Sequence, residues 1–174
     1  LGWETFMIAS IKKNYFLFLI FLLFQITYAQ HFDVTIENTG ESTLFIFQDS
    51  ISSLESGDEI GLFDNQGILN SEGDVGELLV GAGIWTGSQL EITAILAVDL
   101  SQFNGPILPG AQTGNSLSLK VWDDSNQTEY AVESYGLSIG SGTFDGLFSA
   151  IEEIYLQEPH FSVDIEETGE STLF

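Results

Sequence analysis

The chain has 174 residues, of which 44% are hydrophobic, with no cysteine and a formal net charge of −23 at pH 7. Without cysteine, a disulfide framework and a cysteine-linked lipid anchor are both excluded, so the fold depends on its hydrophobic core. The acidity disfavours binding to nucleic acid or to anionic lipid, because both carry negative charge themselves.

The N-terminal region has the pattern of a cleaved secretory signal peptide. Residues 1–6 precede the one methionine and are interpreted as upstream or non-native sequence. Residues 7–29 contain a positive pair, Lys12 and Lys13, an almost unbroken apolar stretch over residues 15–24, and a closing Thr-Tyr-Ala that resembles a cleavage site. The apolar stretch is shorter than the roughly 20 residues that span a bilayer. We therefore expect a secreted or cell-surface protein with no stable membrane span after cleavage.

Removal of residues 1–29 leaves one basic residue, Lys120, against 25 acidic residues. Three interpretations of this acidity stay open. It can form a solvated surface suited to salty water, it can bind calcium, or it can attract a basic partner.

The rest of the chain reads as short strands separated by turn-forming residues, and helix patterns are weak. This spacing predicts an all-β antiparallel sandwich of jelly-roll or immunoglobulin-like kind. A short helix is the alternative for the last segment. The expected strands are Phe32–Glu37, Ser42–Gln48, Glu59–Phe63, Glu77–Trp85, Gln89–Val98, Ser116–Trp122, Glu129–Glu133 and Phe148–Leu156, and the expected turns include Asp64–Gly67.

A stretch of the chain occurs twice. Residues 31–45, HFDVTIENTGESTLF, match residues 160–174, HFSVDIEETGESTLF, at twelve of fifteen positions. The unchanged Phe, Val and Ile fall on alternate positions, which is typical of a strand with one buried face. The spacing of 129 residues is a domain length rather than a solenoid period. We therefore expect a complete module over residues 30–158 and the start of a second, truncated copy over residues 159–174.

The runs SLESGDEIGLFDNQG (residues 53–67), GELLVGAGIWTG (residues 76–87) and GNSLSLKVWDDSNQTEY (residues 114–130) carry a resemblance. They resemble a tandem repeat module of large secreted bacterial surface proteins, often exported by type IX secretion. The resemblance implies an adhesive or structural role. It also implies neighbouring copies of the same module, and glycans or cell-surface components, as partners. Leu79 stands where the family often has cysteine.

Patterns that would indicate catalysis are few. The sequence has no G-x-S-x-G elbow and no cysteine nucleophile, and its two histidines, His31 and His160, occupy the same position of the repeat. The glycine triplets at residues 81–87 and 140–146 miss the dinucleotide-binding spacing by one residue. Gly61 is instead expected to let another backbone or a large ring approach its strand. We predict that the protein is not an enzyme.

Two groups of oxygen-bearing side chains are tentative calcium sites, because calcium prefers carboxylate and amide oxygens. Neither group matches the known calcium-loop motif, and solvated turns are the alternative. No other cofactor is expected. The candidate ligands are Asp64, Asn65, Asn70, Glu72, Asp74 and Glu77 in the first group, and Asp123, Asp124, Asn126 and Glu129 in the second.

Two further binding modes are open. Trp85, Trp122, Tyr130 and Tyr135 are candidates for a sugar platform, which would make the chain a carbohydrate-binding module; the alternative is that Trp85 and Trp122 cap the core. In the C-terminal copy, Phe161, Val163 and Ile165 are candidates for strand donation to another copy, as in an extracellular filament. The favoured function is a non-catalytic adhesin or stalk unit.

Overall fold

The computed structural model describes residues 30–157, which fold entirely into strands, turns and one short 3₁₀ helix. The predicted all-β class is confirmed. The elements are β1 (Ser42–Phe47), β2 (Glu59–Ile68), β3 (Val75–Ile84), β4 (Leu90–Ile95), β5 (Val98–Asp99), η1 (Ser101–Phe103), β6 (Ile107–Leu108), β7 (Ser118–Asp123), β8 (Thr128–Ile139) and β9 (Phe148–Leu156).

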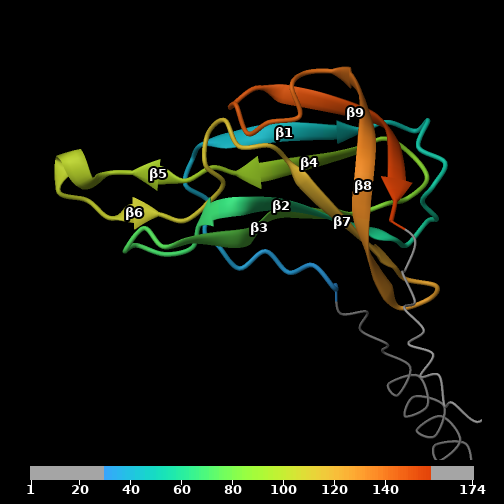
Figure 1. The fold of residues 1–174 in the computed structure, drawn as a ribbon, viewed down its shortest axis with the longest axis horizontal. Coiled ribbons are helices and arrows are strands. Elements are labelled where there is room, and N and C mark those ends of the chain that lie inside the picture. The colour runs from blue at the N-terminus through green and yellow to red at the C-terminus, as the bar shows by residue number, and fades with distance from the viewer. Residues whose placement is uncertain (1–29, 158–174) are drawn as a thin grey trace, which may run out of the picture. The chain divides into compact units, whose positions relative to one another are not determined.

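Seven of these strands form one large mixed sheet in the order β3-β2-β7-β8-β9-β1-β4. Every pair is antiparallel except β1 with β9, which run parallel. The start of β8 pairs with β7 and the remainder pairs with β9, so this one strand connects the two halves of the sheet. Figure 1 shows β8 crossing between the layer that contains β1 and β9 and the layer that contains β2 and β7. The arrangement is consistent with a β-sandwich or barrel-like fold.

One hydrophobic core is enclosed by both halves of the sheet. Phe45 and Phe47 of β1, Ile60 and Leu62 of β2, and Val121 of β7 are fully buried. Their strand neighbours are more exposed on β1 and β7, as the alternation of side chains along a strand requires. Burial of such side chains is the main stabilising contribution to the fold, at about 1.5–3 kcal/mol for each large apolar side chain.

The predicted strand at Phe32–Glu37 is wrong, although the predicted alternation is confirmed. Phe32 is buried and Val34 and Ile36 are half-buried, whereas the residues between them are exposed. The segment nevertheless has no ladder partner. Its first backbone N–H groups donate to a side-chain carboxylate instead of a neighbouring strand, as described below. Alternating burial shows that one face is covered, but it does not require strand pairing.

The predicted turn at Asp64–Gly67 is also wrong, because these residues continue β2 to Ile68. The register with β3 shifts between Asp64 and Gly67, so the polar residues mark a bulge rather than a chain reversal. The alternative of a helix over Ala150–Leu156 is wrong as well, since this segment lies in β9. The short pair β5–β6, with η1 between its strands, was not predicted; Figure 1 shows it extending beyond β4.

Several predictions lie outside the described residues. They are the upstream residues 1–6, the signal peptide over residues 7–29, the second copy over residues 159–174, and strand donation by Phe161, Val163 and Ile165. The described residues end at Gln157, whose backbone N–H donates to the carbonyl oxygen of Ala131 at an N···O distance of 2.8 Å.

Candidate functional site

The outer face of β2, β7 and β8 carries a cluster of charged and aromatic side chains. Glu59 of β2 pairs with Trp122 of β7, and Trp122 pairs with Glu129 of β8. Directly paired residues of adjacent strands present their side chains on the same face. Because Val121, next to Trp122, points into the core, this face is the outer one. We refer to Glu59, Gly61, Phe63, Trp122 and Glu129 together as the dipeptide site, since they contact the dipeptide His31–Phe32.

Glu59 holds the main chain of the dipeptide. The backbone N–H of His31 donates to Oε1 of Glu59 at 2.9 Å, and the backbone N–H of Phe32 donates to Oε2 at 3.0 Å. Glu59 is only 6% exposed. Hydrogen bonds to a carboxylate are stronger than those between neutral groups, and a buried carboxylate that loses its donors is costly. The site therefore requires two N–H donors at this position.

The imidazole of His31 contacts the dipeptide site through the face of its ring and through Nε2. It stacks on Trp122 with ring centroids 3.8 Å apart and an interplanar angle of 7°. Its Nε2 lies 3.0 Å from Oε2 of Glu129. Trp122 and Glu129 thus favour a flat ring that carries an N–H donor on its edge.

Phe32 fills the other end of the dipeptide site. Its ring is 4% exposed and packs edge-to-face on Phe63, with centroids 5.7 Å apart. Gly61 lies beneath both rings, and a Cβ added there would be 2.7 Å from the Phe63 ring and 3.1 Å from the Phe32 ring. The expectation that Gly61 permits close approach of a large ring is confirmed. Glycine is needed here because any side chain would displace the aromatic pair.

Lys120 is the one lysine or arginine among residues 30–157, and it lies beside the dipeptide site. Its Nζ is 2.7 Å from Oε1 of Glu77, 3.8 Å from Oε1 of Glu129 and 4.5 Å from the centroid of the Phe63 ring. A cation over an aromatic face and between two carboxylates reduces the repulsion among the acidic groups. Glu77 and Glu129, predicted as calcium ligands in separate groups, therefore converge on an ammonium group.

The repeated segment keeps the residues that make these contacts. His31 and Phe32 are identical to His160 and Phe161. The three positions that differ between the copies, residues 33, 35 and 38, are all exposed in the first copy. The Oγ1 of Thr39, which is also unchanged, donates to the carbonyl oxygen of Leu96 at 2.6 Å. The substitutions thus avoid the positions that attach the segment to its module.

The other predicted calcium ligands take part in local hydrogen bonding. Asp64 is 1% exposed, and its two oxygens accept from the backbone N–H groups of Gln66 and Gln112 and from Nδ2 of Asn115. Its carboxylate therefore fixes the β2 bulge to the loop before β7. Its neighbour Asn65 is exposed.

The turn between β2 and β3 is closed by its own side chains. Oδ1 of Asn70 accepts from the backbone N–H groups of Glu72 and Asp74, and Nδ2 of Asn70 donates to Oδ2 of Asp74 at 2.8 Å. These contacts are those of a polar turn, the alternative to a calcium loop.

The turn between β7 and β8 is closed in the same way. Asp123 accepts hydrogen bonds from Ser125 and Asn126, and these bonds hold the pKa of Asp123 below its ordinary value of 3.8, with the Asn126 side chain as the largest cause. Asp124 accepts from Gln127. Within residues 30–157, no group of three or more His, Asp or Glu side chains is arranged to hold a metal ion.

The four predicted sugar-binding rings do not form a platform. Trp85 is 1% exposed, so the correction is that it belongs to the core and offers no face to a sugar. Trp122 is covered on one face by His31. Tyr130 pairs with Val121, and therefore lies on the opposite face of the sheet from Trp122. Tyr135 packs against the core, where burial raises its pKa, and its hydroxyl donates to backbone carbonyls.

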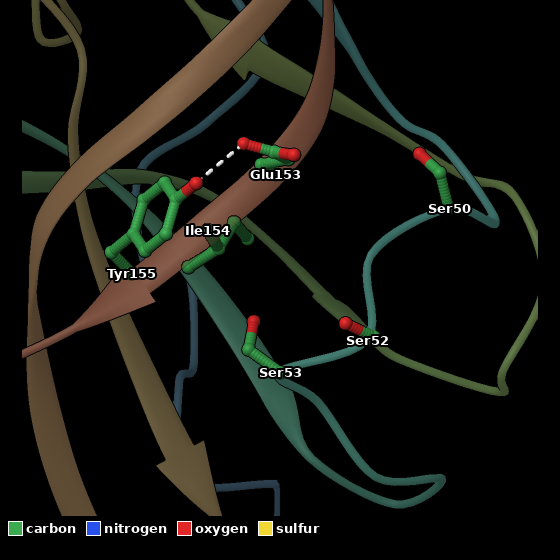
Figure 2. Close-up of a pocket in the computed structure, with 6 residues that line it drawn as sticks. All are labelled: Ser50, Ser52, Ser53, Glu153, Ile154 and Tyr155. Carbon is green, nitrogen blue, oxygen red and sulfur yellow. Dashed lines mark hydrogen bonds between the residues drawn. The ribbon is translucent and has the colours of Figure 1, made fainter.

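A different part of the surface contains a small polar hollow of about 210 Å³. Figure 2 shows it between the loop that follows β1 and the end of β9. The hydroxyl of Tyr155 donates to Oε2 of Glu153 at 2.6 Å, and this hydrogen bond is the main cause that raises the pKa of Tyr155. Its lining residues are Ser50, Ser52, Ser53, Glu153, Ile154 and Tyr155.

The dipeptide site and the polar hollow were not predicted from the sequence. Glu59 is one of 26 acidic residues, and its burial depends on a segment that approaches from 28 positions away. The hollow joins residues about a hundred positions apart, and serines carry no spacing signal. The signal in the sequence for the dipeptide is that His31 and Phe32 are identical to His160 and Phe161.

Comparison with protein-family models, with curated proteins and with solved structures finds no match to this chain. Among residues 30–157, no helix is long and apolar enough to cross a membrane.

Proposed function

We propose that residues 30–158 form one unit of a secreted bacterial surface protein built from tandem β-sandwich modules of jelly-roll or immunoglobulin-like kind. The unit serves as a stalk or adhesin element, and its role is structural and adhesive rather than catalytic.

The observation that carries this proposal is the repeated segment together with its contacts. The dipeptide that begins the repeat is attached to its own module by a buried carboxylate, a stacked indole and a phenylalanine ring. The identical dipeptide recurs 129 residues later, directly after the last strand of the module. A second copy of an attachment segment is expected where a second module begins.

The surface composition supports an extracellular role. With one lysine among the described residues and acids spread over many turns, the module has a strongly negative surface, whose self-repulsion is reduced in salt-rich surroundings. Polar turns such as that of Asn70 and Asp74 are stabilised by internal hydrogen bonds.

The test is to follow the native protein on the cells that produce it. An antiserum against residues 30–157 should label intact cells, and added protease should remove the label without lysis. The coding sequence beyond residue 174 should continue with strands equivalent to β2 and β7, including a GDEIG-like run. A protein found only inside the cell, or a reading frame without a second module, would contradict the proposal.

A carbohydrate-binding module is the second candidate, and the polar hollow is the observation that favours it. Tyr155 is 53% exposed next to Glu153 and three serines, a combination of ring, carboxylate and hydroxyl groups suited to a sugar. Affinity electrophoresis through gels that contain soluble polysaccharides would test it. Retardation of the module that is lost in Tyr155→Ala, with Tyr130→Ala as the matched control, would support this candidate.

A further inference from the structure

The dipeptide that fills the site occurs a second time in the chain. The site recognises two backbone N–H groups, an imidazole ring and a phenyl ring. His160 and Phe161 supply the same four groups in the same order. The next residue changes from Asp33 to Ser162, but Asp33 is exposed, so this difference does not affect the contacts.

The described chain ends beside the strand that carries Glu129 of the dipeptide site. The backbone N–H of Gln157 donates to the carbonyl oxygen of Ala131, two residues from Glu129 along β8. Because β9 runs antiparallel to β8, the chain at Gln157 is directed toward Glu129. Three further residues lead to His160, and an extended chain covers about 3.3 Å per residue, or about 10 Å in total. Val132, the β8 partner of the preceding Leu156, fixes this direction.

We propose that the dipeptide site binds either His31–Phe32 or His160–Phe161 of the same chain, so that the first module can hold the start of the second. The inference uses the tandem architecture of the proposed function. When the second dipeptide occupies the site, Glu59 keeps its two N–H donors and the outer face stays covered. The exchange couples neighbouring modules through a connector of a few residues.

The occupant is the chain's own segment rather than that of another molecule. A ligand tethered by a short connector acts at an effective concentration of about the millimolar range. A second molecule has to reach that local concentration while carrying the same strong negative charge, which opposes its approach.

The test is a cycle of four proteins, each comprising residues 30–174. They are the unmodified chain, H31A/F32A, H160A/F161A and the quadruple variant. Thermal unfolding is followed by circular dichroism, and the mass of each protein is measured by light scattering. The unmodified His160–Phe161 should rescue H31A/F32A, so the quadruple variant should unfold at least about 4 °C below H31A/F32A. H160A/F161A alone should unfold within about 1 °C of the unmodified chain, since His31–Phe32 then fills the site.

Every outcome of the cycle decides the proposal. Failure of H31A/F32A to fold, or equal midpoints for H31A/F32A and the quadruple variant, would overturn it, because either result shows that the second dipeptide does not replace the first. A quadruple variant that alone fails to fold would support it. Rescue accompanied by dimers would show that the occupant comes from another molecule, and would overturn the same-chain assignment.

The specificity of the rescue is checked with Glu59→Gln in the H31A/F32A background. Loss of the second acceptor oxygen should remove most of the rescue, whereas Glu91→Gln on β4 should leave it unchanged. These measurements use purified protein alone, so their failure would leave the surface location and the continuing reading frame to be judged separately.

Discussion

The two halves of the large sheet have different outer faces. On β2 and β7, the outer face is covered by His31 and Phe32, and its carboxylate Glu59 is buried. On β8 and β9, Ile139 is 54% exposed and Phe148 is 46% exposed. Among residues 30–157, no segment covers these two side chains as His31 and Phe32 cover Glu59. Burial on an outer face therefore depends on whether a segment of the chain crosses it.

Glu59→Ala should give the largest effect on this comparison. The backbone N–H groups of His31 and Phe32 would lose their acceptor, which we expect to lower the free energy of unfolding by about 1–3 kcal/mol. Glu91→Ala is the matched control, because Glu91 is exposed on the outer face of β4, and it should change stability by less than about 0.5 kcal/mol. Urea unfolding measures both. Equal effects of the two substitutions would contradict the structural role of Glu59.

Gly61→Ala should come next. The added methyl group would lie 2.7 Å from the Phe63 ring and 3.1 Å from the Phe32 ring, and overpacking of this kind costs about 1–3 kcal/mol. Gly136→Ala on β8 is the control. The atom nearest to its added methyl group is the Cβ of Glu153 at 3.3 Å, so the loss of unfolding free energy should be smaller. Protease cleavage near residue 32 should also become faster in Gly61→Ala only. If both glycines tolerate alanine equally, Phe32 does not pack on Gly61 in solution.

Ile139→Ser should have a small effect, because a side chain that is already 54% exposed loses little buried area. Surface substitutions of this kind usually change the free energy of unfolding by less than about 0.5 kcal/mol. Phe32→Ser, at a residue that is 4% exposed, should cost several times more. Urea unfolding of the two variants measures both free energies. A large loss of unfolding free energy in Ile139→Ser would mean that the outer face of β8 and β9 is covered.

The smallest effect should appear in acid. Hydrogen bonds from Asn126 and Ser125 lower the pKa of Asp123 below 3.8, and the backbone N–H of Leu147 and the Ser141 hydroxyl lower that of Asp145. A lowered folded-state pKa contributes stability that is present above pH 3.8 and is lost as the pH falls through the folded-state value. Asp123→Asn should therefore show a flatter loss of stability from about pH 4 downward. If the free energy of unfolding depends on pH in the same way in Asp123→Asn and in the unmodified chain, Asp123 does not contribute to the loss of stability in acid.

The class of structure and most of its strands could be predicted from the amino-acid sequence. Leu117, Leu119 and Val121 alternate with Ser118, Lys120 and Trp122 in the sequence, and in the structure the first three are buried whereas the other three are half-buried. This succeeds because side chains of a strand alternate between two faces, so a local pattern already contains the answer. The repeat likewise predicted a segment with one covered face, and the structure adds that the three substituted positions are exposed.

The surface on which residues 31–36 pack, and the hydrogen-bond partners of the buried carboxylates, could be found in the tertiary structure alone. Asp64 and Glu59 are acidic residues on the same strand, yet one closes a bulge onto Asn115 and the other binds the main chain of His31 and Phe32. Their partners lie 27 to 51 positions away in the sequence. Such contacts depend on strand order and register, which local patterns do not specify, and for the same reason Glu77 and Glu129 meet at Lys120 although they were predicted in separate calcium groups.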